Sequence, residues 1–301
     1  MKTRDILGLG CATIDELLFV DNYPAPDGKV LVNEAQTQGG GLTATALVAG
    51  ARLGAACAYG GMLGPDETSR QVAQIMEAEG IDTSLVSWRA DAAAIRSTII
   101  VDQSAHTRTI FFRRPGLVGA PPDAPSERAI ANSRVLLIDH YGGPGNVRAA
   151  LLARRQGVPV VADFERADVP NWNDFFPLVD HLVLNQSFAQ KLSGETSPVR
   201  AARALWHPER KIVVVTAGED GAVAFDGLSV TRADAYPTDV VDTTGCGDVF
   251  HGVYAATLAW EWPLEKRLQW ANAAASLKAR NVGAQAGIAR FGEVKALINQ
   301  S

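Results

Sequence analysis

Cysteine is scarce in this sequence, and the few cysteines are widely separated. The 301 residues include three, Cys11, Cys57 and Cys246, with no CxxC or Cys/His spacing among them. An odd number without ligand spacing indicates neither a disulfide framework nor a zinc site. We therefore expect Cys11 and Cys57 to be small buried hydrophobic residues.

Long apolar runs and clusters of basic residues are also missing. The longest apolar runs fall well short of the roughly 18 to 20 residues that span a bilayer, and the N-terminus lacks the regions of a signal peptide. The formal net charge is -5, and Lys and Arg are scattered. No basic stripe is present that would suit nucleic acid or an anionic membrane. We expect a cytoplasmic protein that binds neither.

From residue 130 onward, short apolar runs alternate with helical stretches. The runs are "RVLLIDH" (134–140), "VPVVADFE" (158–165), "DHLVLNQ" (180–186) and "KIVVVTAGEDG" (211–221). Continuous rather than alternating apolar residues favour parallel strands that are buried on both faces. Between them, "NVRAALLARRQG" and "SFAQKLSG" end in glycine, as helices often do. The pattern predicts repeated β-α units.

Polar residues stand where each of these runs ends. Parallel open sheets bind ligands just beyond the carboxyl ends of their strands. We therefore expect these residues to line one crevice: Asp139 with His140, Asp163, Asn185, and Thr216 with Gly218.

The first 115 residues have a different pattern. "DILGLGCATID" predicts a core strand that ends at Asp15, whereas the segments that follow resemble shorter, partly alternating strands. We interpret these as a small sheet, a lid with strands from about 14–38 and 96–114. Helices are expected over 39–54 and over 66–82, the second with Asp66 as N-cap. Without a linker or internal repeat, residues 1–301 are predicted to form a single domain.

The stretch "DTTGCGDVFHG" (242–252) carries the strongest chemical signal. Gly245, Cys246 and Gly247 precede a helical segment, so their amides and the helix N-terminus can form an anion hole. Asp248 falls in the first turn and is a candidate base for a hydroxyl that attacks the bound anion. The helix dipole should keep the pKa of Asp248 low, which suits the loose transition state of phosphoryl transfer. The alternative is an ordinary turn with an Asp N-cap.

This string resembles the signature D-T-x-G-A-G-D of the ribokinase-like (PfkB) family of sugar and nucleoside kinases, with Cys246 in place of Ala. "GGGLTATALVAGARLG" resembles the N-terminal signature of that family, and the resemblance extends over essentially the whole chain. It implies an α/β fold with a doubly wound, mostly parallel sheet flanked by helices, and a β-sheet lid. It also implies ATP and Mg²⁺, transfer of the γ-phosphoryl group to a hydroxymethyl group, and a homodimer formed through the lid.

The resemblance also assigns roles to individual residues. Asp248 is the base, and Asp15 with the Gly40–Gly41 turn holds sugar hydroxyls. A monovalent cation, K⁺, is implied beside the anion hole, at Asp242, Thr244 and the Gly283–Gln285 loop. The nucleotide is expected along Asn185, Thr216, Gly218 and Gly221, with Asn272 near the adenosine.

Two positions depart from the pattern of the family. Thr45 stands where an Asn usually binds the sugar, so the choice of substrate stays open. Phe188 stands where the Glu of an Asn-x-x-Glu motif usually organises Mg²⁺ and phosphates. Binding of Mg²⁺ in this protein would then depend on water, substrate phosphates and Asp242.

Within the family, the motifs are most similar to the sulfofructose kinase branch, which implies 6-deoxy-6-sulfofructose as acceptor. Arg113 and Arg114 end the predicted lid strand and could close on an anionic sugar. A solvated pair, or a contact with ATP, is the alternative for them. His140 and Asp139 are candidates for sugar contacts or for structural hydrogen bonds, and we expect His251 to be structural.

Three functions are compatible with these observations. The leading hypothesis is an ATP-dependent sugar kinase whose lid excludes water. A nucleoside kinase of the same fold would need an aromatic-lined pocket for a base. A ligand sensor without turnover is favoured by Thr45 and Phe188, and is opposed by Asp248 and the complete glycine pair.

Overall fold

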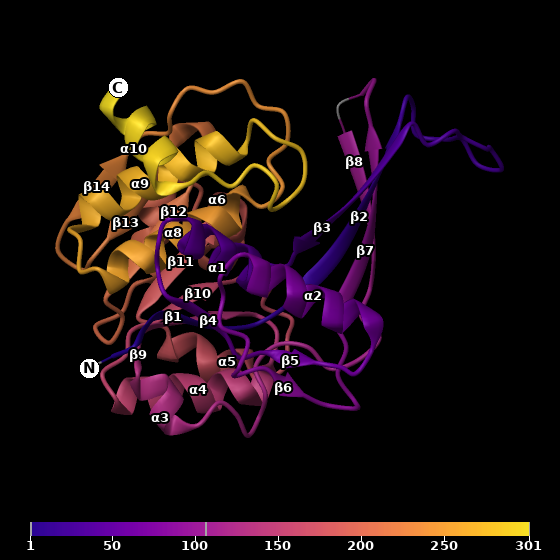
Figure 1. Ribbon diagram of the computed structural model, residues 1–301. Coiled ribbons are helices and arrows are strands. Elements are labelled where there is room, and N and C mark those ends of the chain that lie inside the picture. The colour runs from indigo at the N-terminus through magenta and orange to yellow at the C-terminus, as the bar shows by residue number, and fades with distance from the viewer. Residues whose placement is uncertain (1, 106, 301) are drawn as a thin grey trace.

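A large, mostly parallel sheet forms the centre of the computed structural model, which describes residues 2–105 and 107–300 (Figure 1). In this part of the chain the sheet has eight strands, in the order β14-β13-β12-β11-β10-β9-β1-β4. Only the pairings of β12 with β13 and of β13 with β14 are antiparallel. The strands are β1 (Arg4–Leu9), β4 (Cys57–Tyr59), β9 (Ser133–Asp139), β10 (Val160–Asp163), β11 (His181–Asn185), β12 (Ile212–Thr216), β13 (Ala222–Phe225) and β14 (Val230–Ala233).

Helices cover both faces of this sheet because its strands are apolar on both sides. In β9, Val135 and Leu137 join one buried cluster, and Leu136 and Ile138 join the other. The first cluster is covered by α1 (Leu42–Arg52), α2 (Glu67–Ala78), α8 (Cys246–Ala259), α9 (Leu264–Lys278) and α10 (Phe291–Gln300). The second is covered by α3 (Glu127–Ala131), α4 (Gly143–Arg155), α5 (Trp172–Phe175), α6 (Gln186–Ser193) and α7 (Pro198–Leu205). The predicted doubly wound α/β fold is confirmed.

Several local predictions are met at the helix ends. Asp66 caps α2 by accepting a hydrogen bond from the amide of Ser69. Gly194 ends α6 with φ of 73°, a left-handed conformation that favours glycine. None of the described helices is long and apolar enough to cross a bilayer.

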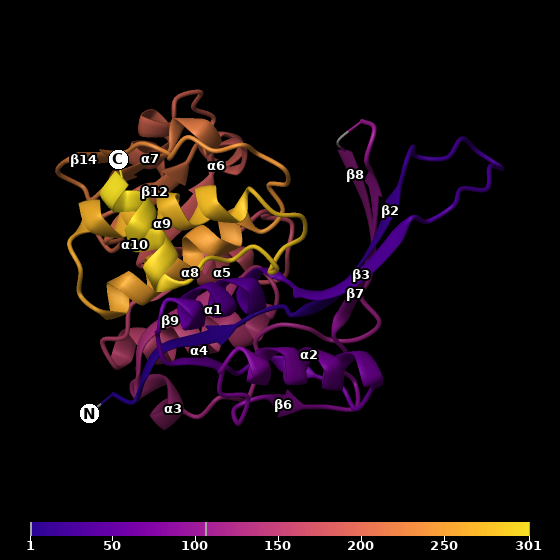
Figure 2. The same cartoon turned by 45° about the horizontal axis from the view of Figure 1, so that its top comes forward.

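A second sheet of four strands projects from the core and is called the small sheet below (Figures 1 and 2). Its strands, in spatial order, are β3 (Glu34–Gly40), β2 (Thr13–Val20), β7 (Ile95–Asp102) and β8 (Thr107–Arg113). These strands occupy the segments predicted for a lid. A separate two-stranded sheet contains β5 (Met62–Leu63) and β6 (Ser87–Trp88).

The prediction of one core strand ending at Asp15 was wrong. The core strand β1 ends at Leu9, and Asp15 belongs to β2 of the small sheet. The break occurs where the amide of Cys11 donates to the carboxylate of Asp139 at 2.7 Å instead of to a neighbouring strand. A side chain at Gly10 would overlap that same carboxylate, so the chain passes close to it. The turn directs β2 out of the core.

Candidate active site

The start of α8 depends on a glycine in a left-handed conformation. Gly245 is the N-cap of α8 with φ of 79°. A Cβ at this position would be 2.7 Å from the carbonyl oxygen of Ala284, so space as well as conformation requires glycine. The helix therefore begins against the loop that follows α9.

Free backbone amides gather at this helix start. Within the described residues, the N–H groups of Gly247 and Asp248 have no protein acceptor. No atom lies within 4 Å of where a Cβ of Gly247 would stand, so there is open space beside this residue. The amide of Cys246 donates to the carbonyl of Thr243 at 3.2 Å, which removes it from the predicted anion hole. The arrangement suits an anion at a helix N-terminus.

Cys246 also adds no negative charge to this site. Burial raises the pKa of its thiol to about 11, so the side chain stays neutral at ordinary pH. A neutral thiol beside the amides does not repel a phosphate.

Asp248 stands in a group of carboxylates. Burial, followed by the charges of Asp163 and Glu165, raises its pKa well above the ordinary value. The prediction of a low pKa was wrong because burial and these neighbours outweigh the helix dipole. Glu165, an exposed residue just beyond β10, was not recognised in the sequence. Its position two residues after the strand-end Asp163 was the available signal.

His251 ties the first turn of α8 to the large sheet. Its Nδ1 is 2.7 Å from the carbonyl oxygen of Gly247 and 3.2 Å from Oδ2 of Asp163. Its Nε2 is 3.0 Å from the carbonyl oxygen of Val183. All three neighbours are hydrogen-bond acceptors, so the ring holds the turn of Asp248 against β10 and β11.

The residues expected to hold sugar hydroxyls lie together at the base of the small sheet. Asp15 is buried and accepts a hydrogen bond from Oγ1 of Thr13 at 2.8 Å. A side chain at Gly40 would overlap the Asp15 carboxylate, and Gly41 turns the chain into α1 with φ of 92°. Burial raises the pKa of Asp15.

Asp139 joins this group to α8. Its carboxylate accepts from the amides of Cys11 and Tyr141 and from Oγ1 of Thr43. Burial raises its pKa to about 6, and its charge also acts on Asp248. Asp139 therefore has the structural role that was one of its two alternatives, and it connects β1, α1 and β9 beside the base candidate.

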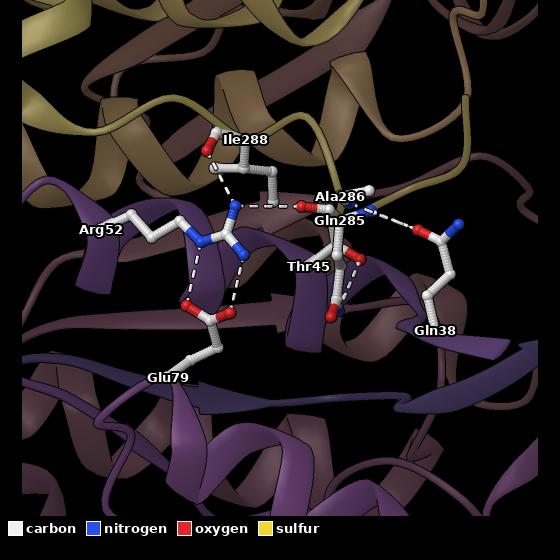
Figure 3. Close-up of polar contacts among 7 residues, drawn as sticks. All are labelled: Gln38, Thr45, Arg52, Glu79, Gln285, Ala286 and Ile288. Atoms are coloured by element: carbon white, nitrogen blue, oxygen red, sulfur yellow. Dashed lines mark hydrogen bonds and ion pairs between the residues drawn. The ribbon is translucent and has the colours of Figure 1, made fainter. Parts of the chain in front are cut away.

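Thr45 does not face an open site. It is fully buried, and its Oγ1 accepts from Nε2 of Gln285 at 3.2 Å (Figure 3). Gln38 of β3 accepts through its Oε1 from the amides of Gln285 and Ala286. Thr45 thus anchors the loop after α9, and a contact of Thr45 with a sugar stays a prediction.

The same loop is fixed from its other end by Arg52. This side chain donates to the carbonyls of Gln285 and Ile288 and pairs with Glu79 (Figure 3). The shortest distance in the ion pair is 2.6 Å. Residues of α1 and β3 together hold the loop that supports Gly245, and Glu79, just after α2, positions Arg52.

The two faces of the small sheet separate the arginines that end it. Partners in a β ladder point to the same face, and Arg113 pairs with Arg96, whereas Phe112 pairs with Ser97. Ser97 in turn is paired with Asp15. Arg113 therefore lies on the face opposite to Asp15, away from the residues that are expected to hold the sugar.

Arg114, by contrast, turns toward the end of β9. Its Cζ is 6.0 Å from the centre of the Tyr141 ring, and the charge of Arg166 also acts on Tyr141. The neighbouring His140 is buried, and its Nδ1 has no hydrogen-bond partner in the described structure. Burial lowers the pKa of His140 to about 4, so its ring is neutral.

The residues predicted along the nucleotide follow two neighbouring strand ends. Asn185 caps α6 by accepting from the amide of Phe188 at 2.9 Å, and in the sheet it is paired with Thr216. Gly218 and Gly221 both have positive φ, and a side chain at Gly221 would overlap the carbonyl of Ala233. The structure therefore brings these residues together at one edge of the sheet.

The side chains of Asn272 and Phe188 both make structural contacts within the protein. The amide nitrogen of Asn272 donates to the carbonyls of Ala233 and Asp234, and the side chain is buried. Phe188 lies in the core beside the Trp172 ring, with ring centres 6.1 Å apart. A contact of Asn272 with adenosine stays a prediction. The side-chain oxygen of Asn272 would make it, because the side-chain nitrogen already donates to two carbonyls.

An ion pair crosses from the small sheet to the loop before α8. Arg108, on the same face as Asp15, is 3.1 Å from Oδ1 of Asp242. A cavity of about 230 Å³ lies beside this pair. It is lined by Leu17, Phe19, Ile99, Val101, Asp102, Gln103, Thr107, Arg108, Val241, Asp242, Thr244, Val282 and Gly283.

The predicted cation ligands already have partners in the protein. Both carboxylate oxygens of Asp242 accept hydrogen bonds, from the amide and Oγ1 of Thr244, from the amide of Gly283 and from Arg108. No group of three or more His, Cys, Asp or Glu that could hold a metal occurs among the described residues. A K⁺ ion at Asp242 would compete with these donors for the carboxylate, and the K⁺ site stays a prediction.

The fold and this site together define a kinase-type α/β protein whose helix start is suited to hold an anion. The chain belongs to the pfkB family of carbohydrate kinases, whose model matches residues 4–290. A bifunctional ribokinase/ribose-5-phosphate isomerase A of Fructilactobacillus sanfranciscensis is 27% identical over 307 residues, which cover 99% of this chain and 56% of that longer protein. The ribokinase of Staphylococcus aureus strain COL is 27% identical over 302 residues, 97% of this chain and 99% of its own.

Solved structures agree on the fold. The Arabidopsis thaliana ribokinase complexed with ribose and ATP superposes with a TM-score of 0.87 at 24% identity, covering 99% of both chains. The protein is therefore a kinase of a sugar or nucleoside, a phosphotransferase with an alcohol group as acceptor.

Proposed function

We propose that this kinase phosphorylates a hydroxymethyl group of an anionic sugar derivative, with Asp248 as the base. The observation that carries the proposal is the start of α8, where the amides of Gly247 and Asp248 have no acceptor among the described residues, the space beside Gly247 is open, and the carboxylate of Asp248 is adjacent. The amides would hold the transferred phosphoryl group, and Asp248 would accept the proton of the acceptor hydroxyl. Asp15 and the Gly40–Gly41 turn would orient the sugar.

Two parts of the fold would support this chemistry. The small sheet would act as a lid that keeps water from the phosphoryl group, and Arg108 would hold it to the loop of Asp242. Mg²⁺ would accompany ATP, and Glu165, an exposed carboxylate that interacts electrostatically with Asp163 and Asp248, is suited to orient it through water. The chemistry that Mg²⁺ supplies when bound is neutralisation of phosphate charge.

An anionic acceptor, with 6-deoxy-6-sulfofructose as the first candidate, is supported by the arginines near β9. Arg114 and Arg166 act on Tyr141 from the end of the large sheet, beside the neutral His140. A sulfonate or phosphate on the sugar would find the guanidinium group of Arg114 there, and near it that of Arg166, which pairs with Asp168. The nucleoside alternative is not favoured, since Phe19 is the only aromatic residue lining the cavity under the small sheet in the described structure.

A panel of acceptors tests this function. Neutral sugars, sugar phosphates, sugar acids, 6-deoxy-6-sulfofructose and nucleosides are compared by ADP release and by phosphorylated product. We expect an anionic sugar to have the highest kcat/KM, and we expect Arg114→Gln to lower that value by about tenfold or more. Arg113→Gln is the matched control, because the adjacent side chain lies on the opposite face, and it should leave the preference unchanged.

Other outcomes of the panel are equally informative. A neutral sugar or nucleoside as best acceptor would refute the anionic substrate. Equal losses in the two variants would show that general charge, and not the position of Arg114, determines the choice.

We also propose a homodimer that forms through the small sheet. β8 is an edge strand, and its consecutive apolar residues Ile110, Phe111 and Phe112 are exposed by 47%, 54% and 62%. An exposed edge strand with large apolar side chains is suited to pairing with a second copy.

A further inference from the structure

A buried lysine lies behind the anion-binding turn. Lys278 is the last residue of α9 and is 0% exposed. Its Nζ donates to the carbonyl oxygens of Asp242 at 2.9 Å and Asn281 at 3.0 Å. Burial of an ammonium group is costly unless polar partners compensate it, so this position requires an explanation.

The two carbonyls belong to the two loops that build the anion hole. Asp242 begins the loop that leads to Gly245, and Asn281 lies in the loop whose Ala284 packs on Gly245. The amides of Val241 and Asp242 donate to the carbonyl of Ala279, which joins the loops further. The ammonium group therefore connects both loops directly behind the site.

Carbonyl oxygens from converging loops are also the ligands that K⁺ takes in proteins. Lys278 brings the same single positive charge to such oxygens, but on a covalent stem. The carboxylate of Asp242 is meanwhile surrounded by hydrogen-bond donors, as described above. The loops are thus held together by groups of the protein itself.

We infer that the ammonium group of Lys278 takes the place of a monovalent cation in this kinase, so that the enzyme needs no K⁺. The inference rests on the proposed function for its catalytic readout. The charge of Lys278 acts on Asp242, Cys246 and Asp248, so it is placed to stabilise negative charge at the anion hole. Since it touches backbone carbonyls and not substrate, Lys278 is a positioning residue.

The first experiment uses the unmodified protein. Activity and melting temperature are measured in tetramethylammonium buffers, with K⁺, Na⁺ or NH₄⁺ added at constant ionic strength. We expect kcat, KM for ATP and the melting temperature to be the same in all of them. Activation of several-fold by K⁺, or a melting temperature that rises with K⁺, would overturn the inference.

The second experiment removes the charge with Lys278→Met, which keeps the length of the side chain. We expect kcat to fall by about a hundredfold in buffer without K⁺. Added K⁺ or NH₄⁺ should restore part of this loss, because the carbonyls of Asp242 and Asn281 are then free to bind it. The melting temperature of the variant should rise with K⁺, as expected for a ligand that binds only the folded state.

Lys191→Met is the matched control. Lys191 is also in the last turn of its helix, α6, but it is exposed. This variant should show neither the loss nor any response to K⁺. A similar response of both variants, or full activity of Lys278→Met without K⁺, would contradict the inference.

The outcomes distinguish the two proposals. If no acceptor is phosphorylated, the proposed function fails, and the melting temperatures still report whether Lys278 replaces a cation. If Lys278→Met does not fold, the cation series on the unmodified protein decides the question.

Discussion

The large and small sheets differ in how their sequences mark them and in what they contribute to the site. β9 to β12 are continuous apolar runs, and residues such as Leu136 and Val214 are 0% exposed. In β8 of the small sheet, all seven residues are exposed. The large sheet places the strand-end groups and α8, whereas the small sheet presents side chains whose roles depend on the face they occupy. The comparison shows that a strand with apolar residues on both faces can be placed in the core from its sequence. In an exposed strand, the face that each side chain occupies depends on how that strand pairs with its neighbour.

The largest effect on activity is expected in the region of the large sheet, at Asp248 of α8. We expect Asp248→Asn to reduce kcat by about a hundredfold or more, because the variant cannot accept the proton of the acceptor hydroxyl. Replacing one half-buried carboxylate in a group of three should leave the fold intact, as circular dichroism would show. Near-normal turnover would refute the assignment of Asp248 as base.

The pH dependence provides an independent control for this variant. The pKa of Asp248 is raised well above its ordinary value of 3.8, chiefly by burial. Since the base must be deprotonated, kcat/KM should decline as pH falls through that raised pKa. The residual activity of Asp248→Asn should lack this acidic decline. A decline that persists in the variant would have to come from another group.

The core was predictable from the sequence because each of its signals is local. Continuous apolar runs, the glycines around Cys246 and the strand-end polar residues all lie within short stretches. The contacts of Thr45 and Lys278 could not be predicted in this way. Their partners, Gln285, Asp242 and Asn281, are contributed by loops, and only folding brings helix α1 with Thr45 against the loop of Gln285, which is far away in the sequence.

For the small sheet, the sequence indicated the strands but not the directions of their side chains. The β ladder places Arg108 on the face of Asp15 and Arg113 on the other. Strand register decides this, and a shift of one residue would exchange the two faces. The segment was predicted without its register, so Arg108, the arginine that pairs with Asp242, was missed.

An intermediate effect is expected at the edge of the small sheet. Phe111→Glu should weaken the proposed dimer by about tenfold or more, because a charge would replace an exposed apolar side chain in the contact. Sedimentation equilibrium over a range of concentrations measures the change. Leu228→Glu is a suitable control, since Leu228 is 93% exposed and lies outside the small sheet. A monomeric unmodified protein would refute the dimer.

The smallest effect is expected where the two regions meet, at the ion pair of Arg108 with Asp242. Arg108 is 37% exposed and Asp242 is 10% exposed, and partly exposed pairs contribute at most about 1 kcal/mol, or roughly fivefold in an equilibrium. We therefore expect Arg108→Gln to raise KM for the acceptor by no more than that factor. The small sheet would open more often, so a larger share of ADP release should occur without phosphorylated product. Arg96→Gln, which breaks the pair with Glu16 on the opposite face, should change neither quantity. A loss of a hundredfold in Arg108→Gln would instead place Arg108 in direct contact with the substrate, and the small sheet would then contribute to binding as well as closure.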